Sequence, residues 1–176
     1  YIQDLTVLDA RCLAAKKAGA ERFVITGGGE PGLLKFDNLI QTIKIAKQHF
    51  DKIILITNGI FLSSKLEEER ERRLKELVSA GLTVLAVSRH SDSNEINRQI
   101  MGIDIGSELI FNSIQNLNLD LRTRLICVLQ KQGVCDAKTI KDYLDYAAAN
   151  KVNEVCFKEL YVASTTESLY SISKEN

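Results

Sequence analysis

The chain has 176 residues, of which 45% are apolar and 26% are charged, enough for a single domain with a sizeable core. Its 23 Lys and Arg residues balance its 23 Asp and Glu residues, so no overall field would attract nucleic acid or an anionic membrane, and we expect neither as a partner. The chain has no apolar run of roughly 18 residues and no basic-then-apolar N-terminal signal, which predicts a cytoplasmic location.

Short apolar, β-branched runs alternate along the chain with helical patterns. The runs predict strands at residues 22–26, 52–57, 83–88, 122–130 and 153–161. Apolar residues at three-to-four-residue spacing predict helices around residues 5–12, 39–46, 66–78, 109–117 and 140–147. A strand-helix-strand unit that repeats about every thirty residues implies parallel strands with right-handed crossovers. The sequence therefore predicts an α/β sheet or partial barrel, and local periodicity does not decide whether the sheet closes.

Three residues mark expected helix ends. Gly19, Gly81 and Asn150 each stand just before a predicted strand, where a left-handed C-cap is expected.

The four cysteines are dispersed along the chain, at Cys12, Cys127, Cys135 and Cys156. Three of them fall on predicted strands or on a core-facing helix. We therefore expect reduced thiols that pack in the interior, and neither disulfides nor metal ligands.

The carboxyl ends of parallel strands form the edge at which α/β folds bind ligands, so the polar residues there are the functional candidates. Four of the five predicted strands end in polar segments. These are Thr26-Gly27-Gly28-Gly29-Glu30, Thr57-Asn58-Gly59, Ser88-Arg89-His90 and Gln130-Lys131-Gln132-Gly133.

The glycine-rich segment admits more than one interpretation. Gly27, Gly29 and Gly32 satisfy the G-x-G-x-x-G dinucleotide pattern, but Pro31 interrupts the turn before a helix begins, and no ribose-binding acid follows the next strand. A better fit is an ammonium group on a small zwitterion, such as the methionine end of S-adenosylmethionine, because glycines allow close backbone approach and Glu30 adds an anion. On the residues alone, a tight turn with a solvated Glu30 is equally favoured.

Taken together, the strand ends resemble those of the radical S-adenosylmethionine (radical SAM) superfamily. The segment from Thr26 to Pro31, followed by Leu33-Leu34, is similar to that family's second-strand signature, and Thr57-Asn58-Gly59 is similar to its third-strand ending. The branch that includes the molybdenum-cofactor cyclase has a serine where Ser88 stands and a basic residue near Arg124. Its sixth-strand ending resembles Phe157-Lys158-Glu159-Leu160-Tyr161.

This resemblance implies a (β/α)6 partial barrel in which residues 1–176 form one core domain. The predicted strands would be the second to the sixth. The first strand and the C-x3-C-x2-C loop that holds a 4Fe-4S cluster would lie upstream of Tyr1, since no such cysteine spacing occurs here. The chain is accordingly expected to be a fragment that is inactive without its cluster loop.

The resemblance also implies a reaction and its partners. S-adenosylmethionine and a 4Fe-4S cluster would be the cofactors, and reductive cleavage would give a 5′-deoxyadenosyl radical that abstracts hydrogen from a small-molecule or peptide substrate. The electron would come from a donor such as a flavodoxin or ferredoxin.

The resemblance assigns roles to residues at the strand ends. No side chain of this chain needs to act as a catalytic acid or base or as a metal ligand, although His90 could transfer a proton and Arg89 could bind a carboxylate or phosphate of the substrate. The residues expected to bind the cofactor are Gly28, Gly29, Glu30, Ser88, Arg124 and Tyr161. Those expected to meet the substrate are Thr57, Asn58, Arg89 and His90.

Two other functions remain open at this level. The chain could be a cluster-free binding or regulatory module that keeps the fold without radical chemistry. It could also be a TIM-like or Rossmann-like enzyme that uses phosphate or NAD, and comparing the binding of S-adenosylmethionine with that of NAD would distinguish these cases.

Overall fold

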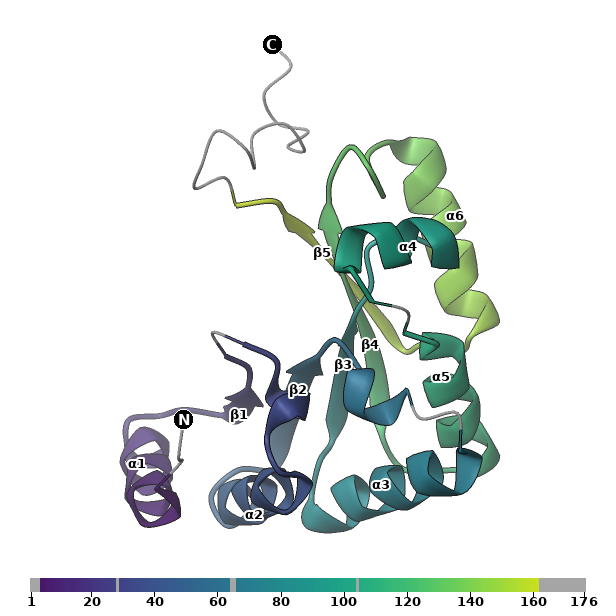
Figure 1. Ribbon diagram of the computed structural model, residues 1–176. Helices are drawn as coiled ribbons and strands as arrows, with labels where there is room; N and C mark the ends of the chain where they lie inside the picture. Colours follow the sequence, from purple (N-terminus) through teal and green to yellow (C-terminus); the bar gives the residue numbers. More distant parts are fainter. Residues whose placement is uncertain (1–3, 28, 64–65, 104, 162–176) are drawn as a thin grey trace.

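The computed structural model describes residues 4–27, 29–63, 66–103 and 105–161 (Figure 1). Within these residues, five strands alternate with α-helices and two short 3-10 turns. In chain order the elements are α1 (Leu5–Lys17), β1 (Arg22–Ile25), η1 (Pro31–Leu33), α2 (Phe36–Lys47), β2 (Lys52–Thr57), η2 (Ile60–Leu62), α3 (Glu67–Ala80), β3 (Val84–Ser88), α4 (Asn94–Met101), α5 (Ser107–Asn116), β4 (Arg122–Leu129), α6 (Ala137–Ala149) and β5 (Glu154–Glu159).

The strands form one parallel sheet whose spatial order follows the sequence, β1-β2-β3-β4-β5. Each strand pairs with the next, and Ser88 at the end of β3 lies opposite Ile126 in β4. A Rossmann sheet reverses its strand order at a switch point, whereas here the chain always advances in one direction, as in a barrel. The predicted parallel α/β architecture is confirmed, and the Rossmann alternative is wrong.

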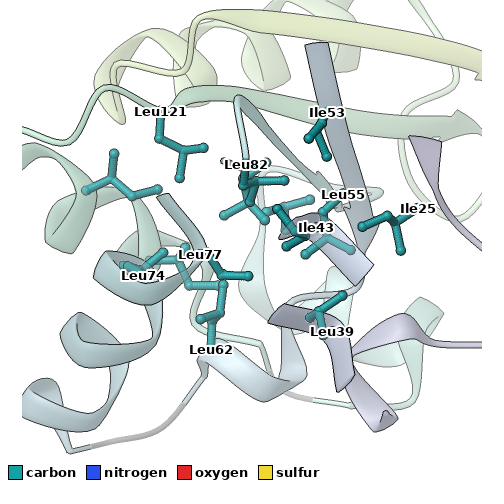
Figure 2. Close-up of a cluster of buried hydrophobic side chains, with 14 of the residues drawn as sticks. Ile25, Leu39, Ile43, Ile53, Leu55, Leu62, Leu74, Leu77, Leu82 and Leu121 are labelled. Atoms are coloured by element: carbon teal, nitrogen blue, oxygen red, sulfur yellow. The ribbon is translucent and has the colours of Figure 1, made fainter. Parts of the chain in front are cut away.

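The two faces of the sheet differ in character. The outer face packs on the helices, which lie in a row in which α1 contacts α2, α2 contacts α3, and α3 contacts α5 (Figure 1). This layer holds the main core, in which Ile43, Ile53, Leu55, Leu74 and Leu77 are all fully buried (Figure 2). A smaller apolar cluster of Ile54, Val84, Ala86 and Ile126 covers the inner face. Side chains alternate between the faces along each strand, so every second residue of a strand end is available to a ligand on the inner side.

The helix ends follow the predictions with one shift. Gly19 and Gly81 adopt left-handed φ angles of 91° and 113° and end α1 and α3, as expected. Asn150 does not adopt that conformation, since its φ is −89°, and Lys151 takes the left-handed position instead with a φ of 51°. The side-chain amide of Asn150 donates to the Tyr146 carbonyl at 2.9 Å, which keeps Asn150 on the helix and moves the turn one residue on.

Helix α4 was not predicted from the sequence. It is amphipathic, but its eight residues span little more than two turns, which is shorter than the stretch over which a helical period is usually recognised. Its start is set by Ser93, whose hydroxyl accepts from the Ile96 amide, and its end by Gly102 at a φ of 71°. Of the helices in the described residues, none is long and apolar enough to span a membrane.

The cysteines give a test of this packing. All four are free thiols, as expected, with Cys12 and Cys127 buried and Cys135 and Cys156 partly exposed. Burial raises the pKa of Cys127 to about 12 and also raises that of Cys12, so neither forms the reactive thiolate near neutral pH. With a chromogenic disulfide reagent at pH 7.5 we expect two thiols to react in the native protein and all four in denaturant. Rapid reaction of Cys127 in the native protein would contradict the packing of β4 against the helices.

Candidate functional site

A pocket of about 270 Å³ lies at the carboxyl ends of β1, β2 and β3. Its walls come from the segments that follow these strands and from the end of α4. The residues that line it are Thr26, Gly27, Gly29, Glu30, Pro31, Ile56, Thr57, Asn58, Ser88, His90 and Met101. The pocket therefore stands at the edge where parallel α/β folds bind ligands.

The carboxylate of Glu30 joins the two strand ends that form one wall. One oxygen accepts from the Gly32 amide at 2.7 Å and from the Thr57 hydroxyl, and the other accepts from the Asn58 amide at 2.7 Å. Thr57, which is 2% exposed, in turn accepts from the Gly59 amide at 2.9 Å. These bonds hold the segment after β1 against the segment after β2, so Glu30 is a structural clamp as well as an anion at the pocket wall.

Two glycines near Glu30 differ in their surroundings. A Cβ at Gly32 would lie 2.4 Å from the Phe61 ring and 2.9 Å from Glu30 Oε1, so the turn η1 can pack there only because residue 32 has no side chain. A Cβ at Gly29 would meet no atom within 4 Å. The backbone at Gly29 thus borders open space in the pocket, and Gly28 lies outside the described residues.

Six of the predicted site residues come together in this pocket: Gly29, Glu30, Thr57, Asn58, Ser88 and His90. These six residues could be predicted from the sequence, because residues at the carboxyl ends of neighbouring parallel strands meet at one edge of the sheet and only the strand boundaries are needed to find them. The pocket also includes Met101 from α4, which the sequence analysis missed together with its helix. A sequence signal for α4 exists in Ser93, a preferred N-cap residue just before the helix, and in Gly102, a preferred C-cap residue.

Arg89 does not line the pocket. It follows Ser88 and therefore points to the helix side of the sheet, where it is completely buried. Its guanidinium donates to Ser107 Oγ at 2.9 Å and Asn94 Oδ1 at 2.6 Å and stacks on the Tyr146 ring, 4.2 Å from the centroid. Arg89 joins α4, α5 and α6 to the end of β3, so the structure gives this residue a packing role and no contact with a ligand in this pocket.

Arg124 and Tyr161 also lie apart from the pocket. Arg124 shares the inner face of the sheet with Ile126, but its guanidinium donates to Glu154 Oε2 at 2.8 and 2.5 Å, and Arg122 donates to the other oxygen of the same carboxylate. Tyr161 is 84% exposed at the last described position. Neither residue contacts the pocket in this structure.

His90 lines the pocket with its ring held in place. Its Nδ1 accepts from the Val128 amide at 3.0 Å, and burial lowers the pKa of the imidazole below its usual value. The ring is therefore neutral near pH 7.

The described residues contain no group of three or more His, Cys, Asp or Glu side chains that could hold a metal ion. The cysteines are spread over α1, the outer and inner faces of the sheet and the loop before α6, so the described residues do not fit an iron-sulfur cluster.

The chain belongs to the radical SAM superfamily, whose sequence pattern it matches over residues 2–156. Membership implies S-adenosylmethionine and a 4Fe-4S cluster as the family's cofactors, and it implies an enzyme. Comparison with curated protein sequences gave no match.

Solved structures show the same fold at low sequence identity. The chain is similar to methylornithine synthase (PylB), with a TM-score of 0.70 and 14% identity over 100% of this chain and 50% of that one. It is similar to TYW1 with a lysine-pyruvate adduct bound, with a TM-score of 0.59 and 17% identity over 94% and 55%. A third match is coproporphyrinogen III oxidase (HemN) from Escherichia coli, described as a radical SAM enzyme, with a TM-score of 0.60 and 15% identity over 93% and 38%.

The same fold extends outside the superfamily. A 2,3-dimethylmalate lyase of the PEP mutase/isocitrate lyase superfamily matches with a TM-score of 0.60 and 9% identity over 91% of this chain and 56% of that one. The barrel architecture alone therefore does not select a reaction. The chain spans about half the length of the first two radical SAM structures.

The Glu30 clamp predicts a loss of stability. In Glu30→Gln one carboxylate oxygen becomes an NH2 group that faces backbone or hydroxyl donors, so we expect unfolding to require about 1 to 3 kcal/mol less free energy. Urea denaturation followed by circular dichroism measures this. The matched control is Glu21→Gln, an exposed residue just before β1, which should have little effect. Equal stability of the two variants would show that the clamp does not hold the loops together.

The Arg124–Glu154 pair predicts a pH dependence. Hydrogen bonds and charge from Arg124 and then Arg122 hold the pKa of Glu154 below its usual 4.5. A depressed pKa in the folded state means that this stabilisation is present above pH 4.5 and is lost as the pH falls through the lower folded value. The stability difference between wild type and Glu154→Gln should therefore be present at pH 7 and become smaller as the pH is lowered below 4.5 to pH 3.

Urea titrations of the two proteins at both pH values measure this difference. The control is Glu159→Gln, an exposed residue on the same strand, which should show no such change. A difference that persists undiminished at pH 3 would contradict the assigned ion pair.

Proposed function

We propose that this chain is the S-adenosylmethionine-binding part of a radical SAM enzyme, and that the pocket at the ends of β1, β2 and β3 is its cofactor site. The observation that carries the proposal is the meeting of the open glycine backbone at Gly29, the Glu30 carboxylate and Ser88 in one pocket of a superfamily member. When bound, S-adenosylmethionine would supply the 5′-deoxyadenosyl group that removes hydrogen from a substrate.

The glycine backbone and Glu30 suit the amino-acid end of the cofactor. At Gly29 no side chain stands between the main chain and the pocket, so backbone polar groups can approach a ligand closely. The Glu30 carboxylate accepts three hydrogen bonds from the protein, and an ionised carboxylate has about four acceptor positions. Glu30 can therefore keep its clamp and still attract an ammonium group. Gly28 is proposed for the same role from its place between Gly27 and Gly29.

Ser88 extends the site to the inner face of β3. Its hydroxyl can donate to a carboxylate or a ribose oxygen of the cofactor. The roles expected for Arg124 and Tyr161 are no part of this proposal, because Glu154 engages the first and the second is exposed. We also propose a closer relation to the branch of the molybdenum-cofactor cyclase. This relation rests on the residue types at Ser88 and Arg124 and assigns Arg124 no contact with the cofactor.

The described residues supply no step that involves the cluster, so the proposal for this chain is a binding function. They bind and orient S-adenosylmethionine, and the electron donor and the substrate belong to the activity of the whole enzyme. Thr57 acts in the clamp, while Asn58 is the proposed contact with whatever molecule shares the pocket with S-adenosylmethionine.

A cluster-free module that binds S-adenosylmethionine without cleaving it is the second candidate, favoured by the missing metal-ligand group in the described residues. Anaerobic reconstitution with iron and sulfide separates the two in any longer protein that contains this chain. Brown absorbance with reductant-dependent 5′-deoxyadenosine indicates the enzyme, and a colourless protein that still binds S-adenosylmethionine indicates the module.

Thermal unfolding of the chain tests the binding site directly. S-adenosylmethionine at about a hundredfold excess over its Kd should raise the Tm by about 5 to 10 °C, and NAD at the same concentration should not. In Gly29→Val the added side chain enters open space, so the ligand-free Tm should stay the same while the shift is reduced. Gly32→Ala should instead lower the ligand-free Tm, because its Cβ would collide with Phe61. A full shift in Gly29→Val would place the ligand elsewhere.

A further inference from the structure

The backbone around His90 is fixed from several sides. The His90 amide donates to Oδ1 of Asn97 at 2.8 Å, and Asn97 is only 2% exposed. The carbonyl of the preceding residue, Arg89, accepts from the Tyr143 hydroxyl at 2.8 Å. A Cβ at position 133 would lie 2.3 Å from the His90 carbonyl oxygen, so Gly133 packs directly on this segment. These contacts come from α4, α6 and the loop after β4, and they determine where the ring can reach.

The ring itself is fixed through one nitrogen. Val128 lies beyond the last β3–β4 pair, Ser88 with Ile126, and its amide donates to Nδ1 of His90 at 3.0 Å. A nitrogen that accepts this bond carries no hydrogen, so a neutral His90 must carry its hydrogen on Nε2. Protonation of Nδ1 would place two N–H groups against each other and break the bond to Val128.

The other nitrogen, Nε2, carries the hydrogen of the neutral ring. Among the described residues, no hydrogen-bond partner occurs for Nε2. Nε2 is also not among the buried side-chain polar atoms of the described residues that lack a partner. His90 lines the pocket, so its ring borders the space where a ligand would lie.

We propose that His90 is a fixed, neutral hydrogen-bond donor of this pocket, which binds an acceptor atom of S-adenosylmethionine through Nε2–H. This assignment rests on the proposed function. It replaces the proton-transfer role expected from the sequence, because the only basic nitrogen of the neutral ring is already engaged by Val128. His90 therefore determines specificity and transfers no proton.

The polarity of the pocket agrees with this role. Glu30 and the backbone at Gly29 form one wall of the pocket, and His90 contributes a hydrogen-bond donor from the segment after β3. Glu30 is the titratable residue of that wall. The groups packed on His90 from other elements, Asn97, Val128 and Gly133, do not titrate. S-adenosylmethionine has a cationic amine for the acidic wall and carboxylate, hydroxyl and adenine-nitrogen acceptors for the donor. A ligand without an acceptor at this position would leave Nε2–H unpaired, which costs binding free energy.

The tautomer of His90 can be measured without any ligand. The chain has two histidines, so a ¹⁵N-labelled imidazole spectrum contains two ring systems, and His49→Gln assigns them. His49 Nε2 lies 2.7 Å from Asp9 Oδ1, which joins α1 to the segment after α2, and His49 serves as the internal reference. At pH 7 we expect His90 to show hydrogen on Nε2 and none on Nδ1. A charged ring, or hydrogen on Nδ1, would overturn the proposal.

The contact with the ligand is tested by titration with S-adenosylmethionine. In His90→Asn the side-chain oxygen can replace Nδ1 as acceptor for Val128, but no donor reaches the position of Nε2, so the Kd should rise about five- to tenfold. The ligand-free Tm should stay close to that of the wild type. His49→Asn, the matched change away from the pocket, should leave the Kd unchanged.

The outcomes separate this proposal from the proposed function. An unchanged Kd in His90→Asn would overturn the donor role. If His90→Asn is poorly folded, a shift of the wild-type Nε2 resonance on addition of S-adenosylmethionine decides in its place, with no shift counting against the proposal. If the wild-type chain binds no S-adenosylmethionine, the proposed function is wrong, and so is the hydrogen bond from Nε2–H to that ligand. The ligand-free spectrum still shows whether His90 carries its hydrogen on Nε2.

Discussion

The carboxylate of Glu30 is the contact on which the arrangement of the pocket depends. It accepts from Gly32 on its own loop and from Thr57 and Asn58 at the end of β2, and so joins the two chain segments beyond Ile25 and Leu55, the last residues that pair β1 with β2. In a parallel sheet the strands align through their ladders, but the segments beyond the last pair have no such constraint. A carboxylate with donors from both loops supplies it, and hydrogen bonds to a charged acceptor are stronger than those between neutral groups. The backbone of Gly29, where an added Cβ would meet no atom within 4 Å, can then face a ligand directly.

The sequence was sufficient for the architecture because the architecture depends on local patterns. Apolar runs define the strands, and their regular alternation with helical periods defines parallel crossovers. Burial on both faces is reached only by the central strands, because β1 and β5 lie at the edges of the sheet and are mostly half-buried or exposed. Gly19 and Gly81 were found because glycine has a strong preference for the left-handed position. Asn150 was placed one residue early, since its side chain bonds back to Tyr146, a choice that propensity cannot resolve. Helix α4 was missed because, although it is amphipathic, it spans little more than two turns.

The candidate site could be predicted only as far as strand ends determine it. Six residues meet in one pocket because they follow strands that lie side by side. Arg89 was misplaced because the alternation of the strand continues past Ser88 and turns the next side chain to the helices. The engagement of Arg124 by Glu154 depends on the β4–β5 register, which pairs these two residues directly and which the sequence does not encode. Long-range register and the partner of a charged group are properties of the folded chain.

The burial of Arg89 limits which amino-acid substitutions the loop after β3 can accept during evolution. A guanidinium that bonds to α5 and to the start of α4 and stacks on an aromatic ring of α6 has a planar shape that lysine cannot reproduce, and an apolar side chain would leave those partners unpaired. Several positions would have to be substituted together, so we expect the sequence of the loop after β3 to evolve slowly. A rigid loop also loses little conformational entropy when a ligand arrives, which favours binding, but it adapts poorly to a ligand of another shape. New substrate preferences are then more readily acquired on other loops of the rim than on the one that carries His90.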